Sequence, residues 1–146
     1  MTILDFNIKL SSPPNKLIKL ATDYEKFSTY LPAQLKSIKI IESDVDKTIT
    51  DEVLSFSTLK LNIEQRTIHK KIAENQLLAE IISGPAKKSV IKTTFKKVEN
   101  GTEVNINIDL HVSLKYKIFI PIIKKWYKMI LTGILYKMNS VEEEIK

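Results

Sequence analysis

The last thirty residues most constrain how this chain can fold, because they predict one long helix after a series of strands. From Lys117 to about Glu144, apolar residues recur every three or four positions, as on the buried face of an amphipathic helix. Pro121 falls near the start, where a missing backbone N–H costs little. Residues 36–115 have the pattern of strands, so a sheet must pack around this helix. We expect that arrangement to leave a cavity between helix and sheet.

The apolar stripe of this helix is wide. It consists of Ile123, Tyr127, Ile130, Ile134, Met138 and Val141, widened by Phe119, Ile122, Trp126 and Met129. Gly133 interrupts the stripe, and we expect it to admit the close approach of a strand.

Alternating apolar and polar residues predict seven strands. We expect them at residues 2–10, 37–43, 48–57, 59–71, 77–83, 89–98 and 102–115. The last is the clearest, with Val104, Ile106, Ile108, Leu110, Val112 and Leu114 on one face and polar residues on the other. One buried face and one wet face are typical of an antiparallel sheet.

Between the first two strands the sequence predicts two short helices. Ser12 is the expected N-cap of the first, and Pro13 fits its first turn. The second begins at Asp23 and is ended by Pro32. The fold class is therefore α+β, in the order strand, two helices, six strands, helix. We interpret residues 1–146 as a single domain.

Composition excludes several classes of protein. The chain has no cysteine, so it has neither disulfides nor a thiolate metal site. No secretory signal pattern opens it, and no apolar run is long enough to span a bilayer. We expect a soluble cytoplasmic protein. The net charge of +6 permits contact with anionic partners, but aromatics are too few for a nucleic-acid platform, and solvated lysines are the simpler interpretation.

No set of residues predicts catalysis. The two histidines, His69 and His111, are far apart in the sequence and lack metal-ligand spacing. The three glycines exclude phosphate-binding loops, and the carboxylates are scattered over strands and turns. We therefore expect no metal and no cofactor, and we leave open whether the protein is an enzyme.

One lysine group adjoins aromatic residues at the start of the final helix. Lys117, Lys124, Lys125 and Lys128 surround Trp126 and Tyr127, and such a group could touch an anionic membrane surface. The alternative, which we favour, is that Trp126 faces the core and the lysines face water.

The segment Asp23-Tyr24-Glu25-Lys26-Phe27 followed by Tyr30-Leu31-Pro32 resembles the START-like (SRPBCC) superfamily, in the branch of polyketide cyclases and coenzyme Q-binding proteins. Gly84-Pro85, Phe95 and Asn100-Gly101 resemble the second half of the same family. The sequence departs from the coenzyme Q-binding branch at Ala33-Gln34, Ala86 and Thr93.

The resemblance implies a helix-grip fold, with a curved antiparallel sheet of about seven strands around the last helix. It also implies binding or transport of a hydrophobic small molecule, such as a lipid, quinone or polyketide, in a pocket between them. The alternatives are a cyclase or dehydratase using the same pocket, or a peripheral module that binds a membrane or partner. The family shares no fixed catalytic residues, so the resemblance implies none here.

Strand alternation and helix periodicity select the residues expected to line the pocket. One question is open in the strand at 59–71, where Leu59, Leu61 and Ile63 are followed in phase by Gln65, Thr67 and His69. Either a bulge reverses the phase, or polar groups enter the cavity. The predicted ligand-binding residues are Gln65, His69, Ile91, Thr93, Phe95, Ile106, Ile108, Leu110, Trp126, Tyr127, Ile130 and Ile134.

Overall fold

The computed structural model describes residues 2–57 and 60–141. The chain begins with β1 (Thr2–Leu10), α1 (Pro14–Ala21), a 3₁₀ helix η1 (Tyr24–Lys26) and α2 (Phe27–Tyr30). Six strands follow: β2 (Leu35–Ser43), β3 (Thr48–Phe56), β4 (Leu61–Ala73), β5 (Gln76–Ser83), β6 (Val90–Val98) and β7 (Gly101–Leu110). A second 3₁₀ helix, η3 (Leu114–Phe119), leads into α3 (Ile120–Ser140).

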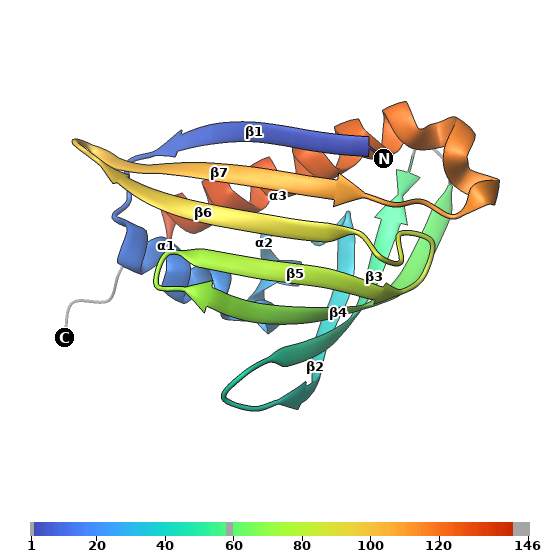
Figure 1. Cartoon of the computed structure of the whole chain (residues 1–146), viewed down its shortest axis with the longest axis horizontal. Helices are drawn as coiled ribbons and strands as arrows, with labels where there is room; N and C mark the ends of the chain where they lie inside the picture. Colours follow the sequence, from blue (N-terminus) through green and yellow to red (C-terminus); the bar gives the residue numbers. More distant parts are fainter. Residues whose placement is uncertain (1, 58–59, 142–146) are drawn as a thin grey trace.

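The seven strands form one antiparallel sheet in the order β1-β7-β6-β5-β4-β3-β2. In Figure 1 the sheet is seen from outside, and α3 runs behind it across the inner face. The helices α1 and α2 lie against α3 and help to close that side. The predicted α+β helix-grip fold is therefore confirmed.

The core lies between the inner face of the sheet and α3. On β7, Val104, Ile106 and Ile108 are almost fully buried, while the intervening Asn105 and Asn107 face outward. On α3, Ile130 and Ile134 face the sheet at helical spacing. Burial on one side of each element explains why both patterns are readable in the sequence.

The last strand is shorter than predicted. It ends at Leu110 instead of residue 115. On the β6 side the pairing ends with Val90 opposite Asp109, and on the β1 side the last described pair is Thr2 with Leu110. Beyond these pairs the chain turns into η3, which leaves Leu114 81% exposed instead of buried.

The helix ends also differ from the prediction. A 3₁₀ helix occupies residues 114–119, so α3 begins at Ile120 instead of Lys117. The predicted helix end at Glu144 and the predicted strand start at Leu59 both lie outside the described residues.

Two local predictions are wrong. Ser12 does not cap α1; its backbone N–H donates to Asn139 Oδ1 at 2.9 Å, which ties the start of α1 to the end of α3. The three atoms nearest to a Cβ built at Gly133 belong to Leu31 and not to a strand. A Cβ at this position would lie 2.9 Å from Cδ1 of Leu31, so the glycine makes room for the residue that ends α2.

Candidate functional site

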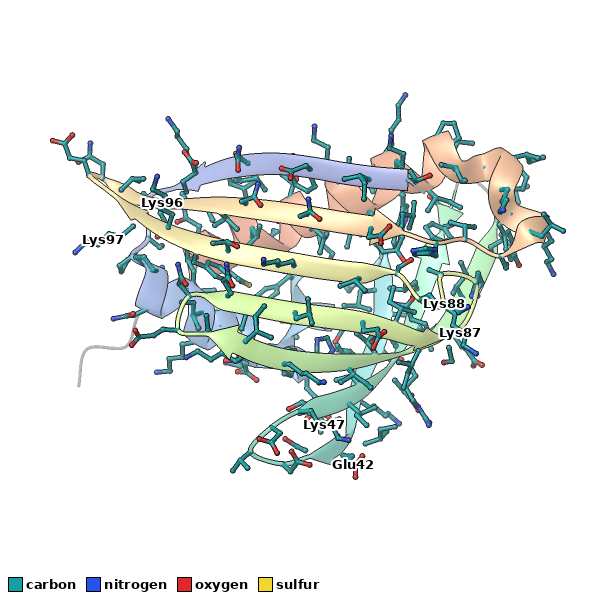
Figure 2. The ribbon with its side chains drawn as sticks, viewed as in Figure 1. Glu42, Lys47, Lys87, Lys88, Lys96 and Lys97 are labelled. Atoms are coloured by element: carbon teal, nitrogen blue, oxygen red, sulfur yellow. The ribbon has the colours of Figure 1, made fainter. Side chains whose placement is uncertain are left out.

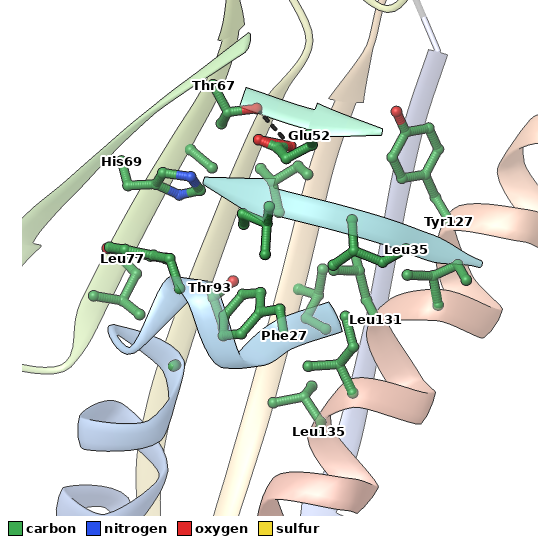
Figure 3. A pocket seen from close by; sticks show the side chains of 18 of the residues that line it. Phe27, Leu35, Glu52, Thr67, His69, Leu77, Thr93, Tyr127, Leu131 and Leu135 are labelled. Atoms are coloured by element: carbon green, nitrogen blue, oxygen red, sulfur yellow. Dashed lines mark hydrogen bonds between the residues drawn. The ribbon is translucent and has the colours of Figure 1, made fainter. Parts of the chain in front are cut away.

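A cavity of about 160 Å³ lies between α3 and the sheet. Its walls come from strands β2 to β7, from α3, and from the segment that runs from the end of α1 through Tyr24 and Phe27. Most of these side chains are aliphatic or aromatic. Figure 3 shows Glu52, Thr67 and His69 on the sheet side of the cavity and Leu131 and Leu135 on the α3 side. The cavity is therefore apolar along its length, with polar groups gathered at one end.

Ten of the twelve residues predicted to line a pocket do line this cavity. They are Gln65, His69, Ile91, Thr93, Phe95, Ile106, Trp126, Tyr127, Ile130 and Ile134. Ile108 and Leu110 are buried in the core but are absent from its wall. The cavity extends towards β4 and β5, so of β7 only Ile106 reaches it.

The strand β4 carries polar groups into the cavity. Its pairing with β3 continues without a break from His69 opposite Thr48 to Leu61 opposite Phe56. The alternation therefore keeps its phase along β4, and Gln65 and Thr67 face inward with Ile63. This settles the choice between a phase-reversing bulge and polar groups in the cavity in favour of the second.

The centre of the polar end is Glu52, a buried carboxylate on β3. Its Oε1 accepts hydrogen bonds from Gln65 Nε2 and from the hydroxyl of Thr67, both at 2.9 Å. Its Oε2 accepts one from the hydroxyl of Thr50 at 2.8 Å. Burial raises the pKa of Glu52, and the three donors oppose that shift by stabilising the ionised form.

His69 joins this cluster through Thr50. Its Nε2 lies 2.8 Å from the Thr50 hydroxyl oxygen, and its ring stacks on Tyr24 with the ring centroids 4.2 Å apart. Burial lowers the pKa of His69 to about 4, so the imidazole is neutral at neutral pH. A continuous chain of hydrogen bonds therefore runs from His69 through Thr50 to Glu52.

Tyr127 and Gln65 separate the main cavity from a smaller one of about 20 Å³, because both residues line each of the two. Burial raises the pKa of the Tyr127 hydroxyl, and the charge of Glu52 raises it further. Tyr127 also packs edge-to-face against Trp126, with the ring centroids 5.1 Å apart. The ring positions at this wall are thus fixed by packing.

Sequence reasoning missed Glu52 and Thr50 as components of the site. It placed Thr67 in phase with Gln65 and His69 but did not include it among the ligand-binding residues. The signal was present in β3, where Leu54 and Phe56 face the core and the same phase continues backward to Glu52 and Thr50. A carboxylate on the buried phase of a strand must find hydrogen-bond donors, and β4 supplies two of them.

The chemistry available at this site is hydrogen bonding inside an apolar chamber. Among the described residues, no group of three or more His, Asp or Glu side chains is placed to hold a metal ion. The described lining residues include no lysine or arginine, so Glu52 is the one charged side chain that they provide.

Comparisons with known proteins identify the fold. No protein-family model and no curated protein matches the sequence. Solved structures do match. The Zhui aromatase/cyclase from Streptomyces sp. R1128 is 6% identical, with a TM-score of 0.82 over 94% of this chain and 93% of the other. A START superfamily protein from Mycobacterium smegmatis is 14% identical, with a TM-score of 0.75 over 94% of each chain.

A third match is norcoclaurine synthase from Thalictrum flavum, solved in complex with dopamine and hydroxybenzaldehyde. It is 12% identical, with a TM-score of 0.74 over 98% of this chain and 89% of the other. At these identities the matches establish the fold alone, a START-like fold that the aromatase/cyclase shares, as the sequence resemblance predicted.

Proposed function

We propose that this protein binds a hydrophobic small molecule, such as a lipid, a quinone or a polyketide-like compound, in the cavity between α3 and the sheet. The observation that carries the proposal is the cavity itself, about 160 Å³ with an almost wholly apolar wall. A dry apolar cavity of roughly 150 Å³ is large enough to hold benzene. Larger ligands require the wall to move.

The energetics of such a cavity favour an apolar occupant. Each Å² of apolar surface removed from water contributes about 25 cal/mol. The wall groups are preformed on strands and on a long helix, so little conformational entropy is lost on binding. A few polar groups at one end are the usual means of orienting a ligand, and Gln65 and His69 are the predicted contacts.

The structural matches support the same proposal. An aromatase/cyclase and a synthase solved with two small aromatic molecules both have this fold. Fold likeness alone leaves the ligand of this chain open, so the proposal rests on the cavity.

The direct test is native mass spectrometry of protein purified from its own host, to detect a co-purifying small molecule. A thermal-shift panel of quinones, fatty acids and polyketides follows, since a ligand that binds only the folded state stabilises it by mass action. We expect at least one class to raise the melting temperature. No adduct and no shift across the panel would overturn the proposal.

A second candidate function is a cyclase or dehydratase reaction in the same cavity. The observation that favours it is the His69–Thr50–Glu52 chain, which could move a proton. The pKa of His69 opposes this enzymatic function, because an imidazole with a pKa of about 4 is a weak base at neutral pH. Binding without chemistry is therefore the better-supported proposal. If the wild type converted a bound polyketide and Glu52→Gln did not, the enzymatic function would become the better-supported proposal.

Contact with an anionic membrane is a further proposal, and its supporting observation lies in η3. Leu114 and Ile118 are each 81% exposed and alternate with Lys115 and Lys117. Exposed apolar residues beside lysines are suited to an anionic lipid surface. Trp126 is buried, so this contact would use η3 with Lys124, Lys125 and Lys128. No helix within residues 2–57 and 60–141 is long and apolar enough to cross a membrane.

Vesicle sedimentation tests the membrane proposal with a charge-matched control. Lys117→Gln/Lys125→Gln should weaken binding to phosphatidylserine vesicles. Lys96→Gln/Lys97→Gln should not, because Figure 2 places Lys96 and Lys97 at the far end of the molecule from η3. Equal loss of vesicle binding in both double variants would show that the attraction depends on total charge and that η3 has no specific role in it.

A further inference from the structure

Gln65, at the polar end of the cavity wall, carries an acceptor that none of the described residues satisfies. Gln65 is 7% exposed, and its Nε2 is committed to Glu52 Oε1. That bond fixes the orientation of the amide, because a carboxylate cannot donate to Gln65 Oε1. Among the described residues, Oε1 is left buried without a hydrogen-bond partner. An unpaired buried acceptor is costly, and a donor brought by a ligand would satisfy it.

His69 offers a second acceptor by the same reasoning about direction. The hydroxyl of Thr50 has one hydrogen, and it donates this to Glu52 Oε2. The 2.8 Å contact between Thr50 and His69 must then be a donation from the Nε2–H of His69. A neutral imidazole that carries its proton on Nε2 presents Nδ1 as an acceptor. The described residues place no donor on Nδ1.

The hydroxyl groups in the cavity wall are not fixed as donors or as acceptors. Tyr24, Thr93 and Tyr127 line the cavity, and each hydroxyl can rotate to donate or to accept. Among the fixed groups at the polar end, by contrast, Gln65 Oε1 and His69 Nδ1 are the acceptors without a described donor, while Gln65 Nε2 keeps one N–H beyond its bond to Glu52. A ligand that carries a donor therefore meets complementary partners.

An anionic ligand meets no compensating charge. The described lining residues provide one carboxylate, Glu52, and no lysine or arginine. Removing an anion from water without a cation to pair it is strongly unfavourable. The ionised carboxylate of Glu52 would add repulsion at short range.

We infer that the cavity selects a neutral apolar molecule bearing a hydrogen-bond donor, a hydroxyl or amino group, and discriminates against carboxylates such as fatty acids. This inference rests on the proposed function, because it names the class of ligand for the same cavity. The donor would lie at the Gln65–His69 end, and the apolar body would lie against α3.

Three probes of similar apolar body test the inference on the intact protein. They are 2-naphthol, which donates; 2-methoxynaphthalene, which only accepts; and 2-naphthoate, which is anionic. Phenol, anisole and benzoate form a smaller parallel set. We expect the donor to bind about tenfold more tightly than the methyl ether, and the anion to bind least. Isothermal titration and thermal shift give the ranking.

Substitutions then test the residues. Glu52→Gln removes the negative charge and supplies an amide that can donate to Gln65 Oε1, so the advantage of naphthol over naphthoate should fall about tenfold. Asp51→Asn is the matched control: the same carboxylate-to-amide change one residue away, on the outer face, where Asp51 pairs with Arg66. It should leave the ranking unchanged.

The outcomes separate the two proposals. Binding of all three naphthalene probes with equal affinity, or preference for naphthoate, would overturn the inference and leave hydrophobic ligand binding intact. Failure of both probe sets to bind, with no other ligand found, would overturn the proposed function and the inference with it. The wild-type ranking decides the inference even if Glu52→Gln fails to fold.

Discussion

His69 and Glu52 are two buried titratable residues on neighbouring strands whose pKa values are shifted in opposite senses. Burial holds His69 neutral by lowering its pKa to about 4, and burial raises the pKa of Glu52. Burial thus disfavours the charged form of each residue, and for Glu52 the three hydrogen-bond donors oppose that effect. The hydrogen-bond chain through Thr50 links them, so the polar end depends on pH.

The protein should lose stability as pH falls from about 6.5 to about 4, through His69. The folded state binds this proton less readily than the unfolded state, so the unfolded state takes up more protons in that window. The loss is up to about 3 kcal/mol for a shift of this size. Glu52 acts in the opposite sense: its raised pKa adds stability at low pH, which is lost as pH rises through its folded value.

Urea denaturation of the wild type and of His69→Gln between pH 4 and pH 7.5 isolates the histidine, because Glu52 is present in both proteins. The difference in unfolding free energy between the wild type and His69→Gln should become smaller as the pH falls. Parallel profiles for the two proteins would show that His69 does not titrate with this shift.

In the β5–β6 connection, substitutions at Gly84 and at Lys88 should have opposite effects on stability. Gly84 has φ +96°, and a Cβ there would lie 2.6 Å from the carbonyl oxygen of Glu64. Gly84→Ala should therefore cost about 1–3 kcal/mol of stability. Lys88 also has a positive φ, of 80°, so Lys88→Gly should be neutral or stabilising. Thermal unfolding of both variants checks the pair; a harmless Gly84→Ala would contradict the clash.

At the scale of elements, α3 contributes a large part of the core through one face. Ile130 is 5% exposed and Ile134 is 6% exposed. Either residue changed to Ala should cost about 2–5 kcal/mol of unfolding free energy. Met129, on the outer face of the same helix and 52% exposed, is the control; Met129→Ala should cost less than about 0.5 kcal/mol. Denaturant unfolding measures all three, and losses below that level at both isoleucines would show that the stripe is not buried.

Element types followed from the sequence because burial on one side imposes a period. The alternation in β7 and the stripe in α3 both reflect a single buried face. The ends of elements were less predictable, because they depend on partners distant in sequence. β7 stops at Leu110, one residue past its last pair with β6, Val90–Asp109, although Val112 and Leu114 continue the apolar pattern beyond the strand.

Site residues were predictable to the extent that they lie on a clear face. Gln65 and His69 were identified because they break the apolar phase of β4. Glu52 was missed because Ile49 and Val53 place apolar residues on the outer face of β3, opposite Leu54 and Phe56, which obscures the phase. The cavity boundary at Ile106 depends on how all the side-chain volumes fill the fold, and a single sequence does not specify that.

At the scale of the whole molecule, the sheet and α3 enclose a chamber with a polar wall on one side. The polar cluster comes from the β3–β4 pair, while the apolar body of the wall includes β5, β6 and α3. Under the proposed function, the β3–β4 pair would orient a ligand, and the remaining elements would set the volume available to it. Substitutions that change the cavity volume should therefore alter affinity, and substitutions of the polar groups should alter selectivity.

Filling the chamber should block binding without unfolding the protein. Thr93 lines the cavity from β6, whereas the adjacent Thr94 is directed away from the cavity, with its hydroxyl 3.4 Å from Gln76 Nε2. Thr93→Phe places a ring in empty space, so it should lower the affinity for 2-naphthol at least about tenfold, with little change in melting temperature. Thr94→Phe makes the same substitution on the opposite face and should leave affinity unchanged.

Thermal unfolding and isothermal titration of the two variants decide whether the chamber is open to ligand. A solidly packed interior would respond to Thr93→Phe with an overpacking cost of about 1–3 kcal/mol. Equal affinity for 2-naphthol in Thr93→Phe and the wild type would place the ligand elsewhere on the molecule. A loss of affinity confined to Thr93→Phe, with both variants folded, would locate binding between the sheet and α3.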